Sequence, residues 1–194
     1  MTRNVTSNNI IEAAKKHEIR EHRNPSSYFS SVESEIWTSG FSSIKKVSMG
    51  FSKMGKPIFA YDKKNRKVPY GESFIFNAPN IGQGEVGYVV QEMFNMKIQI
   101  TIFQMKRKLY LSSYSFHFEL LQDRNKFFRY EKSEYVAEED MEYKPEFHMH
   151  CMGRLSHYPA HKVTIGQLLK NLKANIFNSD NYGKLDPPWG SIFS

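Results

Sequence analysis

The residue types best suited to chemistry are concentrated between positions 146 and 161. This stretch holds the only cysteine, Cys151, and four of the seven histidines: His148, His150, His157 and His161. Imidazole titrates near neutral pH, so it serves as a general acid or base and also as a metal ligand. If residues 147–151 form a strand, alternation places His148 and His150 on one face and Cys151 on the other. We therefore predict a polar face that carries two neighbouring imidazoles.

Two imidazoles beside a cation could cleave RNA through its 2′-hydroxyl group. That reaction needs a base, an acid and a positive charge near the developing phosphorane, and histidine with arginine or lysine supplies all three. Neither a metal nor another cofactor is needed, and we expect none. The candidate catalytic residues are His148, His150, Arg129, Tyr130 and His161.

Two other interpretations of the histidines stay open. One is a metal site, with ligands drawn from the four histidines and Cys151, although a strand would turn the thiol away from His148 and His150. The other is a purely structural role, in which the imidazoles are hydrogen-bonded to acids such as Glu119, Glu142 and Glu146.

The elements that must position these residues read as β-strands. Residues 97–102 alternate polar and apolar side chains, 110–121 carry aromatic residues on one face, and 127–131 form a third short run. Short turns between successive strands favour an antiparallel meander. An acidic, irregular excursion over 132–146 then leads into the strand that contains the histidines.

A helix is predicted over about 164–176. Thr164 and Gln167 have the spacing of a capping box, in which each side chain bonds the other's backbone N–H. The aliphatic residues that follow recur with helical period and should pack on the sheet. They are Ile165, Leu168, Leu169 and Leu172.

The first half of the chain is less informative. Residues 8–23 have a thin apolar stripe and predict a helix that ends before Asn24-Pro25. We expect an N-terminal helical arm over 1–25 and a single α+β domain over 26–194, with a sheet core over about 43–152. The predicted fold class is α+β, an antiparallel meander with an N-terminal helix and a C-terminal helix packed on the sheet.

The charge balance predicts an acidic partner. The net charge is +7, which favours nucleic acid, and the RNA chemistry above makes RNA the better candidate than DNA. No apolar run approaches the ~20 residues of a membrane span, so no membrane partner is expected. The N-terminus lacks an apolar signal core, and one cysteine suits a reducing cytoplasm. The candidate nucleic-acid-binding residues are Lys106, Arg107, Lys108, Arg154 and Lys162.

Roughly residues 96–175 resemble the TumE-type toxins of bacterial toxin–antitoxin modules. The resemblance is carried by the aromatic run 114–118, by Phe127-Phe-Arg-Tyr-Glu131, by His148-Met-His150 and by the helix that opens at Thr164. The family has Asp-Asn where this chain has Glu131-Lys132. The resemblance implies a cytoplasmic growth inhibitor with a cognate antitoxin protein, acting on RNA or translation. The alternatives are a non-enzymatic binding protein of phage or mobile-element origin, and a histidine-ligated metalloprotein.

Overall fold

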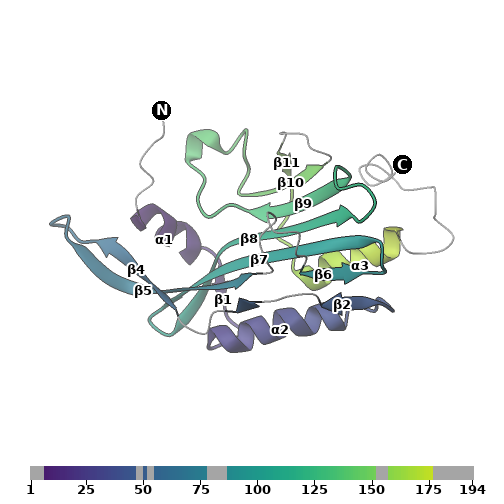
Figure 1. The fold of residues 1–194 in the computed structure, drawn as a ribbon. Coiled ribbons are helices and arrows are strands. Elements are labelled where there is room, and N and C mark those ends of the chain that lie inside the picture. Colours follow the sequence, from purple (N-terminus) through teal and green to yellow (C-terminus); the bar gives the residue numbers. More distant parts are fainter. Residues whose placement is uncertain (1–6, 47–49, 52–54, 78–86, 152–156, 177–194) are drawn as a thin grey trace.

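The computed structural model describes residues 7–46, 50–51, 55–77, 87–151 and 157–176 (Figure 1). Within these residues, a single antiparallel sheet of 11 strands dominates the molecule, and its main path runs β11-β10-β9-β8-β7-β5-β3. β4 pairs with β5, β1 with β8, and β6 with both β2 and β7. The strands are β1 (Glu18–Ile19), β2 (Ile44–Lys46), β3 (Gly50–Phe51), β4 (Lys56–Tyr61), β5 (Lys67–Asn77), β6 (Tyr88–Val90), β7 (Phe94–Met105), β8 (Lys108–Leu120), β9 (Phe127–Lys132), β10 (Phe147–Cys151) and β11 (Tyr158–Pro159).

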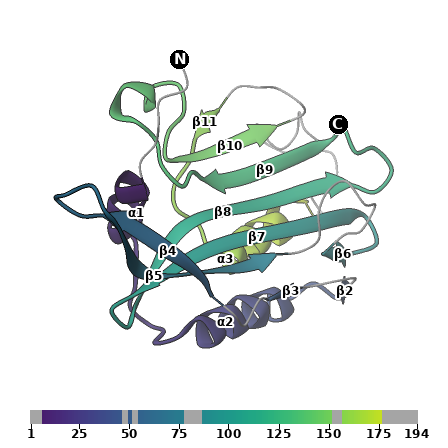
Figure 2. The ribbon, with the colours of Figure 1, turned by 60° about the vertical axis from the view of Figure 1, so that its left-hand side comes forward.

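Three α-helices accompany the sheet, namely α1 (Ser7–Lys15), α2 (Pro25–Trp37) and α3 (Ile165–Ile176), with a short 3₁₀ helix over Glu138–Asp140. Figure 2 shows α2 and α3 on the same side of the sheet. Asn24 caps α2, since its side chain accepts a hydrogen bond from Ser27 N. The predicted capping box of α3 is confirmed, because Gln167 N bonds Thr164 Oγ1 and Thr164 N bonds Gln167 Oε1.

The two faces of the central strands differ sharply in chemistry. One face carries alternate residues such as Ile98, Phe116 and Phe128, which are buried in the core together with α2 and α3. The predicted helix stripe is confirmed: Ile165, Leu168, Leu169 and Leu172 are all at most 5% exposed. The opposite face carries polar residues at the intervening positions. Strand alternation therefore separates the hydrophobic core from a polar surface that extends across β7, β8, β9 and β10.

The α+β fold class is confirmed, with one difference near the N-terminus. The first helix ends at Lys15, eight residues before the predicted end. The chain then becomes β1, which pairs Glu18 with Tyr110 and Ile19 with Leu109 of β8. Hydrogen bonding to this strand outweighs the helical periodicity of the local sequence. Ile11 and Ala14 of α1 are buried in a second, smaller apolar cluster with residues of β4 and β7.

None of the described helices is both long and apolar enough to cross a membrane.

Candidate functional site

Three histidine rings meet on the polar face at the β10 end of the sheet. The ring centroids of His148, His150 and His157 are 4.5–5.0 Å apart. Each ring offers one ligand nitrogen, and these three atoms all lie within 4.8 Å of one another. The strand register explains the meeting: β10 pairs His148 with Pro159 and Met149 with Tyr158 of β11, so His157 follows opposite His150. We call these three residues the histidine cluster.

The hydrogen bond of His148 fixes which of its nitrogens faces the cluster. Its Nδ1 lies 2.8 Å from the carbonyl oxygen of Pro145, so Nδ1 carries the proton and donates it. Nε2 is then the nitrogen left on the side of the cluster. The side chain is 1% exposed, and among the described residues Nε2 has no hydrogen-bond partner. A buried, unsatisfied acceptor is costly, so this atom is arranged for something other than packing.

Glu131 of β9 adds a carboxylate to the cluster. It is paired with His148 across the strands and therefore shares its face. Its Oε2 lies 3.1 Å from His150 Nε2 and 3.4 Å from His148 Nε2. Burial alone raises the pKa of the Glu131 carboxyl, but the contact with His148 and the charge of Arg129 outweigh it and bring the pKa to about 2. The carboxylate is therefore anionic at neutral pH.

Arg129 supplies the positive charge of the site. It pairs with His150 across β9 and β10, and its Nε lies 3.3 Å from Glu131 Oε1. Burial, helped by the charge of Arg129, lowers the pKa of His150 to about 4. Burial also lowers the pKa of His157. At neutral pH these two imidazoles are neutral and each keeps a lone pair.

A second group of polar residues continues the same face across β7 and β8. Glu119 accepts hydrogen bonds from Lys97 Nζ (2.9 Å) and Asn95 Nδ2 (3.1 Å), and its other oxygen lies 3.2 Å from His117 Nε2. All four residues are at most 8% exposed. His117 pairs with Arg129 of β9, so this group adjoins the histidine cluster. We call the face that these groups share the polar row.

The structure brings only some of the predicted site residues together. His148 and His150 share the polar face, as predicted from strand alternation, and Arg129 joins them through the β9–β10 pairing. Tyr130 lies on the opposite face, paired with Phe116 and Met149, because it alternates with Arg129 along β9. His161 is exposed and is not a member of the cluster.

The predicted nucleic-acid-binding residues do not surround the cluster. Lys106 and Arg107 are exposed in the β7–β8 turn, and Lys108 forms an ion pair with Glu18. Because β8 separates this turn from its His117 end by nine residues, the two are roughly 30 Å apart. Lys162 is exposed on the segment before α3, and Arg154 lies outside the described residues.

The catalytic residues expected from the sequence do not include His157 and Glu131. The sequence offers His157 as a possible metal ligand or a hydrogen-bonded structural residue, and the pairing of β10 with β11 brings it to His150. Glu131 appeared only as a departure from the toxin pattern. Cys151 is buried in the core opposite Phe128, on the face predicted for it, and takes no part in the cluster.

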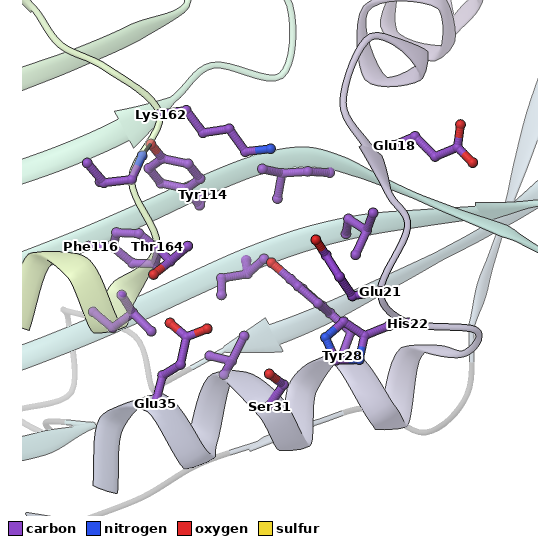
Figure 3. Close-up of a pocket in the computed structure, with 16 residues that line it drawn as sticks. Glu18, Glu21, His22, Tyr28, Ser31, Glu35, Tyr114, Phe116, Lys162 and Thr164 are labelled. Atoms are coloured by element: carbon purple, nitrogen blue, oxygen red, sulfur yellow. Dashed lines mark hydrogen bonds between the residues drawn. The ribbon is translucent and has the colours of Figure 1, made fainter. Parts of the chain in front are cut away.

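A separate cavity of about 200 Å³ lies on the helical side of the sheet, between α2, the segment after β1 and the start of α3 (Figure 3). It carries several acids, but two of them are engaged: Glu35 accepts a hydrogen bond from Gly166 N at the start of α3, and Glu18 pairs with Lys108. His22 lies 3.0 Å from Ser27 Oγ. The Glu35–Gly166 bond joins α2 to the start of α3, and the other two contacts hold the segment around β1 in place.

Comparison of the chain with protein-family models, with curated proteins and with solved structures finds no match.

Proposed function

We propose that this protein is a metal-dependent hydrolase in which the histidine cluster binds a divalent transition metal ion and Glu131 completes the ligand set. The observation that carries the proposal is the meeting of three imidazoles whose ligand atoms lie within 4.8 Å of one another, with the buried Nε2 of His148 lacking a hydrogen bond of good geometry among the described residues. A backbone carbonyl that holds Nδ1–H, as Pro145 does here, is the usual support of a metal-bound histidine.

The distances agree with a ligand set. Zn–N bonds of about 2.0–2.1 Å place tetrahedral ligand atoms roughly 3.3 Å apart. Glu131 Oε2 lies 3.1 and 3.4 Å from the two β10 nitrogens, which matches that separation. The three imidazole nitrogens, within 4.8 Å of one another, would close by roughly an ångström on binding. His150 and His157 are neutral and Glu131 is anionic, which are the protonation states that a metal requires.

The chemistry of such a centre is hydrolysis. A divalent ion held by the histidine cluster and Glu131 would supply a hydroxide nucleophile near neutral pH and a Lewis acid for the hydrolysis of a phosphate ester. In that hydrolysis the oxygen of water would bond to phosphorus, the bond from phosphorus to the leaving oxygen would break, and the leaving oxygen would gain a proton from water. Arg129 beside the cluster stabilises the negative charge that builds up on the phosphoryl oxygens. The net charge of +7 makes RNA the first substrate to test.

Metal-free acid–base cleavage by His148 and His150 is the competing mechanism. It has the Arg129 cation that it needs, but it also needs a protonated imidazole, and burial beside Arg129 keeps His150 neutral at pH 7. The converging lone pairs therefore support the metal mechanism better. A growth-inhibiting role with a cognate antitoxin is the physiological setting that the toxin resemblance suggests.

The test is metal content followed by activity. Purified full-length protein reconstituted with Zn²⁺ or Mn²⁺ should retain about one ion per chain after gel filtration, and His150→Ala and His157→Ala should retain none. His22→Gln, a histidine on the other side of the sheet, is the matched control and should retain the ion. RNA cleavage should disappear with chelator and return with metal. Cleavage by metal-free protein would overturn the proposal in favour of acid–base catalysis, and failure to retain any ion would remove the metal centre.

A further inference from the structure

Every buried side-chain nitrogen or oxygen without a hydrogen-bond partner in the described part of the chain lies on the polar face. There are four: Asn95 Oδ1, His117 Nδ1, Arg129 Nε and His148 Nε2. They belong to four adjacent strands, β7, β8, β9 and β10. Unsatisfied buried groups are rare, so four of them on adjacent strands of one face call for an explanation that a single local defect does not give.

The four atoms differ in what they require. His148 Nε2 belongs to the histidine cluster. Arg129 Nε–H is a donor next to that cluster, lying 3.3 Å from Glu131 Oε1 without the geometry of a hydrogen bond, and it suits an anionic oxygen. His117 is neutral at pH 7 because burial lowers its pKa, and its Nε2 proton points to Glu119, so Nδ1 is an acceptor. Asn95 Oδ1 is also an acceptor. The ligand therefore carries an anion at one end and two hydrogen-bond donors farther along.

The spacing of the strands sets the length of the ligand. Adjacent strands lie roughly 4.8 Å apart, so Arg129 is about one strand spacing from His117 and about two from the strand of Asn95. Asn95 is offset along β7 by two residues from Lys97, the direct partner of His117. The donors of the ligand thus lie roughly 5 Å and 10–12 Å from its anion. A ribonucleotide has these proportions, with a phosphate, then ribose hydroxyls, then a base that carries an amino group.

An aromatic ring stands where the base would lie. Phe127 is paired with Glu119, which is itself paired with Asn95, so the three residues form one cross-strand line. The Phe127 ring is half-buried and stacks on His117, with centroids 5.1 Å apart. Bases bind proteins by stacking on such rings and by hydrogen bonds from their edges. The row thus offers a partner for each part of a nucleotide.

The charges of the row predict that binding depends on the metal. Lys97 is neutralised by Glu119 and Arg129 by Glu131, so the charges of these four side chains cancel. Without a metal ion these pairs leave no excess positive charge to attract a phosphate. A divalent ion in the histidine cluster adds two positive charges at the end where the anion would lie. Metal should therefore strengthen nucleotide binding.

We infer that the polar row is a binding site for a ribonucleotide unit, with phosphate at Arg129 and the histidine cluster, ribose hydroxyls at His117 Nδ1, and an amino-bearing base at Phe127 and Asn95. This inference rests on the proposed metal centre and adds the substrate class. The unit is a free nucleotide or the end of an RNA chain, since both present the same groups.

The test uses calorimetry on metal-loaded full-length protein with inorganic phosphate, AMP, 2′,3′-dideoxy-AMP and a 5′-phosphorylated RNA hexamer. AMP should bind at least about tenfold more tightly than phosphate, and the dideoxy analogue should lose about tenfold relative to AMP. His117→Gln is the decisive variant. Its amide can still donate to Glu119 but cannot replace Nδ1, so it should weaken AMP about tenfold and leave phosphate and metal affinity unchanged.

One control variant and four outcomes separate failure of this inference from failure of the proposed metal centre. Lys106→Gln, in the distant β7–β8 turn, should change none of these affinities. If metal binds but AMP and phosphate have equal affinity, the inference fails while the proposed centre stands. If the dideoxy analogue binds as well as AMP, or if His117→Gln weakens phosphate as much as AMP, the ribose contact is wrong. If no metal binds, the centre itself fails. Comparison of AMP with the hexamer identifies the free nucleotide or the RNA end as the preferred source.

Discussion

Glu131 Oε2 on β9 lies 3.1 Å from His150 Nε2 on β10, so the anionic carboxylate meets a neutral imidazole edge to edge on the buried polar face. Glu131 and His150 meet because Glu131 is the direct cross-strand partner of His148, and His150 lies two residues farther along β10 on the same face. The 3.1 Å between these two atoms is close to the roughly 3.3 Å expected between two ligand atoms of one zinc ion. Several measurable consequences follow from this arrangement and from the network around it.

Glu131→Gln should lower metal affinity by about 10- to 100-fold while leaving the fold intact. The amide keeps the shape of the carboxylate but removes the negative charge that favours a cation. Competition with a coloured chelator measures the affinity, and circular dichroism checks the fold. Glu138→Gln, an exposed acid in the 3₁₀ helix, is the charge-matched control. Equal affinity in Glu131→Gln and wild type would exclude Glu131 from the ligand set.

His117 should make the metal-free protein less stable as the pH falls below about 6.5. Burial holds its pKa below that of an unfolded histidine, so the unfolded chain binds the proton first, and stability is lost from about pH 6.5 down to the folded-state pKa. Urea melts at several pH values measure this slope, and His117→Gln should reduce it by up to about 1.4 kcal/mol per pH unit. An unchanged slope would mean that His117 is already protonated in the folded protein.

Glu119 should add a second loss of stability at lower pH. Burial by itself raises the pKa of its carboxyl, but hydrogen bonds from Lys97 and Asn95 outweigh burial and hold the pKa below its usual value. Its contribution is present above about pH 4.5 and is lost as the pH falls through the lowered pKa. In Glu119→Gln, the free energy of unfolding should therefore fall less steeply with pH below pH 4.5, and the loss of stability between pH 6.5 and the folded-state pKa of His117 should remain. If the free energy of unfolding still falls as steeply below pH 4.5, other carboxylates dominate that loss.

Glu146→Ala should destabilise the protein by about 1–3 kcal/mol. Glu146 Oε1 lies 3.2 Å from Lys132 Nζ and 2.7 Å from His17 Nε2, and the Lys132 side chain has no exposed surface. Removing the acid leaves a buried ammonium whose other hydrogen bonds within the described residues go to the carbonyls of Ser112 and Ser133. The double variant Glu146→Ala, Lys132→Met should recover part of the loss, because no buried charge is left uncompensated. Additive losses in denaturant melts would contradict this account.

Leu169→Ala should cost about 2–5 kcal/mol in denaturant melts, since Leu169 of α3 is fully buried against the sheet. Lys170→Ala, one residue along on the exposed side of the same helix, should change stability by less than about 0.5 kcal/mol. A cost below about 1 kcal/mol at Leu169 would show that the helix is peripheral.

The sequence by itself determined the elements whose signals are local. Alternation from Lys97 to Leu120 predicted the long hairpin and the two chemically different faces, because a strand's side chains alternate whatever surrounds it. The capping box at Thr164 and the aliphatic stripe through Leu169 predicted α3 and its buried side for a similar reason, since both act within a few residues. The shared face of His148 and His150 also followed from alternation, whereas the place of Arg129 beside them depends on the β9–β10 pairing.

The tertiary structure decided what depends on register and on distant partners. The first helix ends at Lys15 because Glu18 and Ile19 pair with a strand about 90 residues away. Glu131 and His157 join the histidines only through the β9–β10 and β10–β11 pairings, which no local pattern specifies. The continuation of the polar face through His117 to Asn95 likewise requires four strands in one register. Periodicity can assign a residue to a face, but only the assembled sheet determines which residues become neighbours.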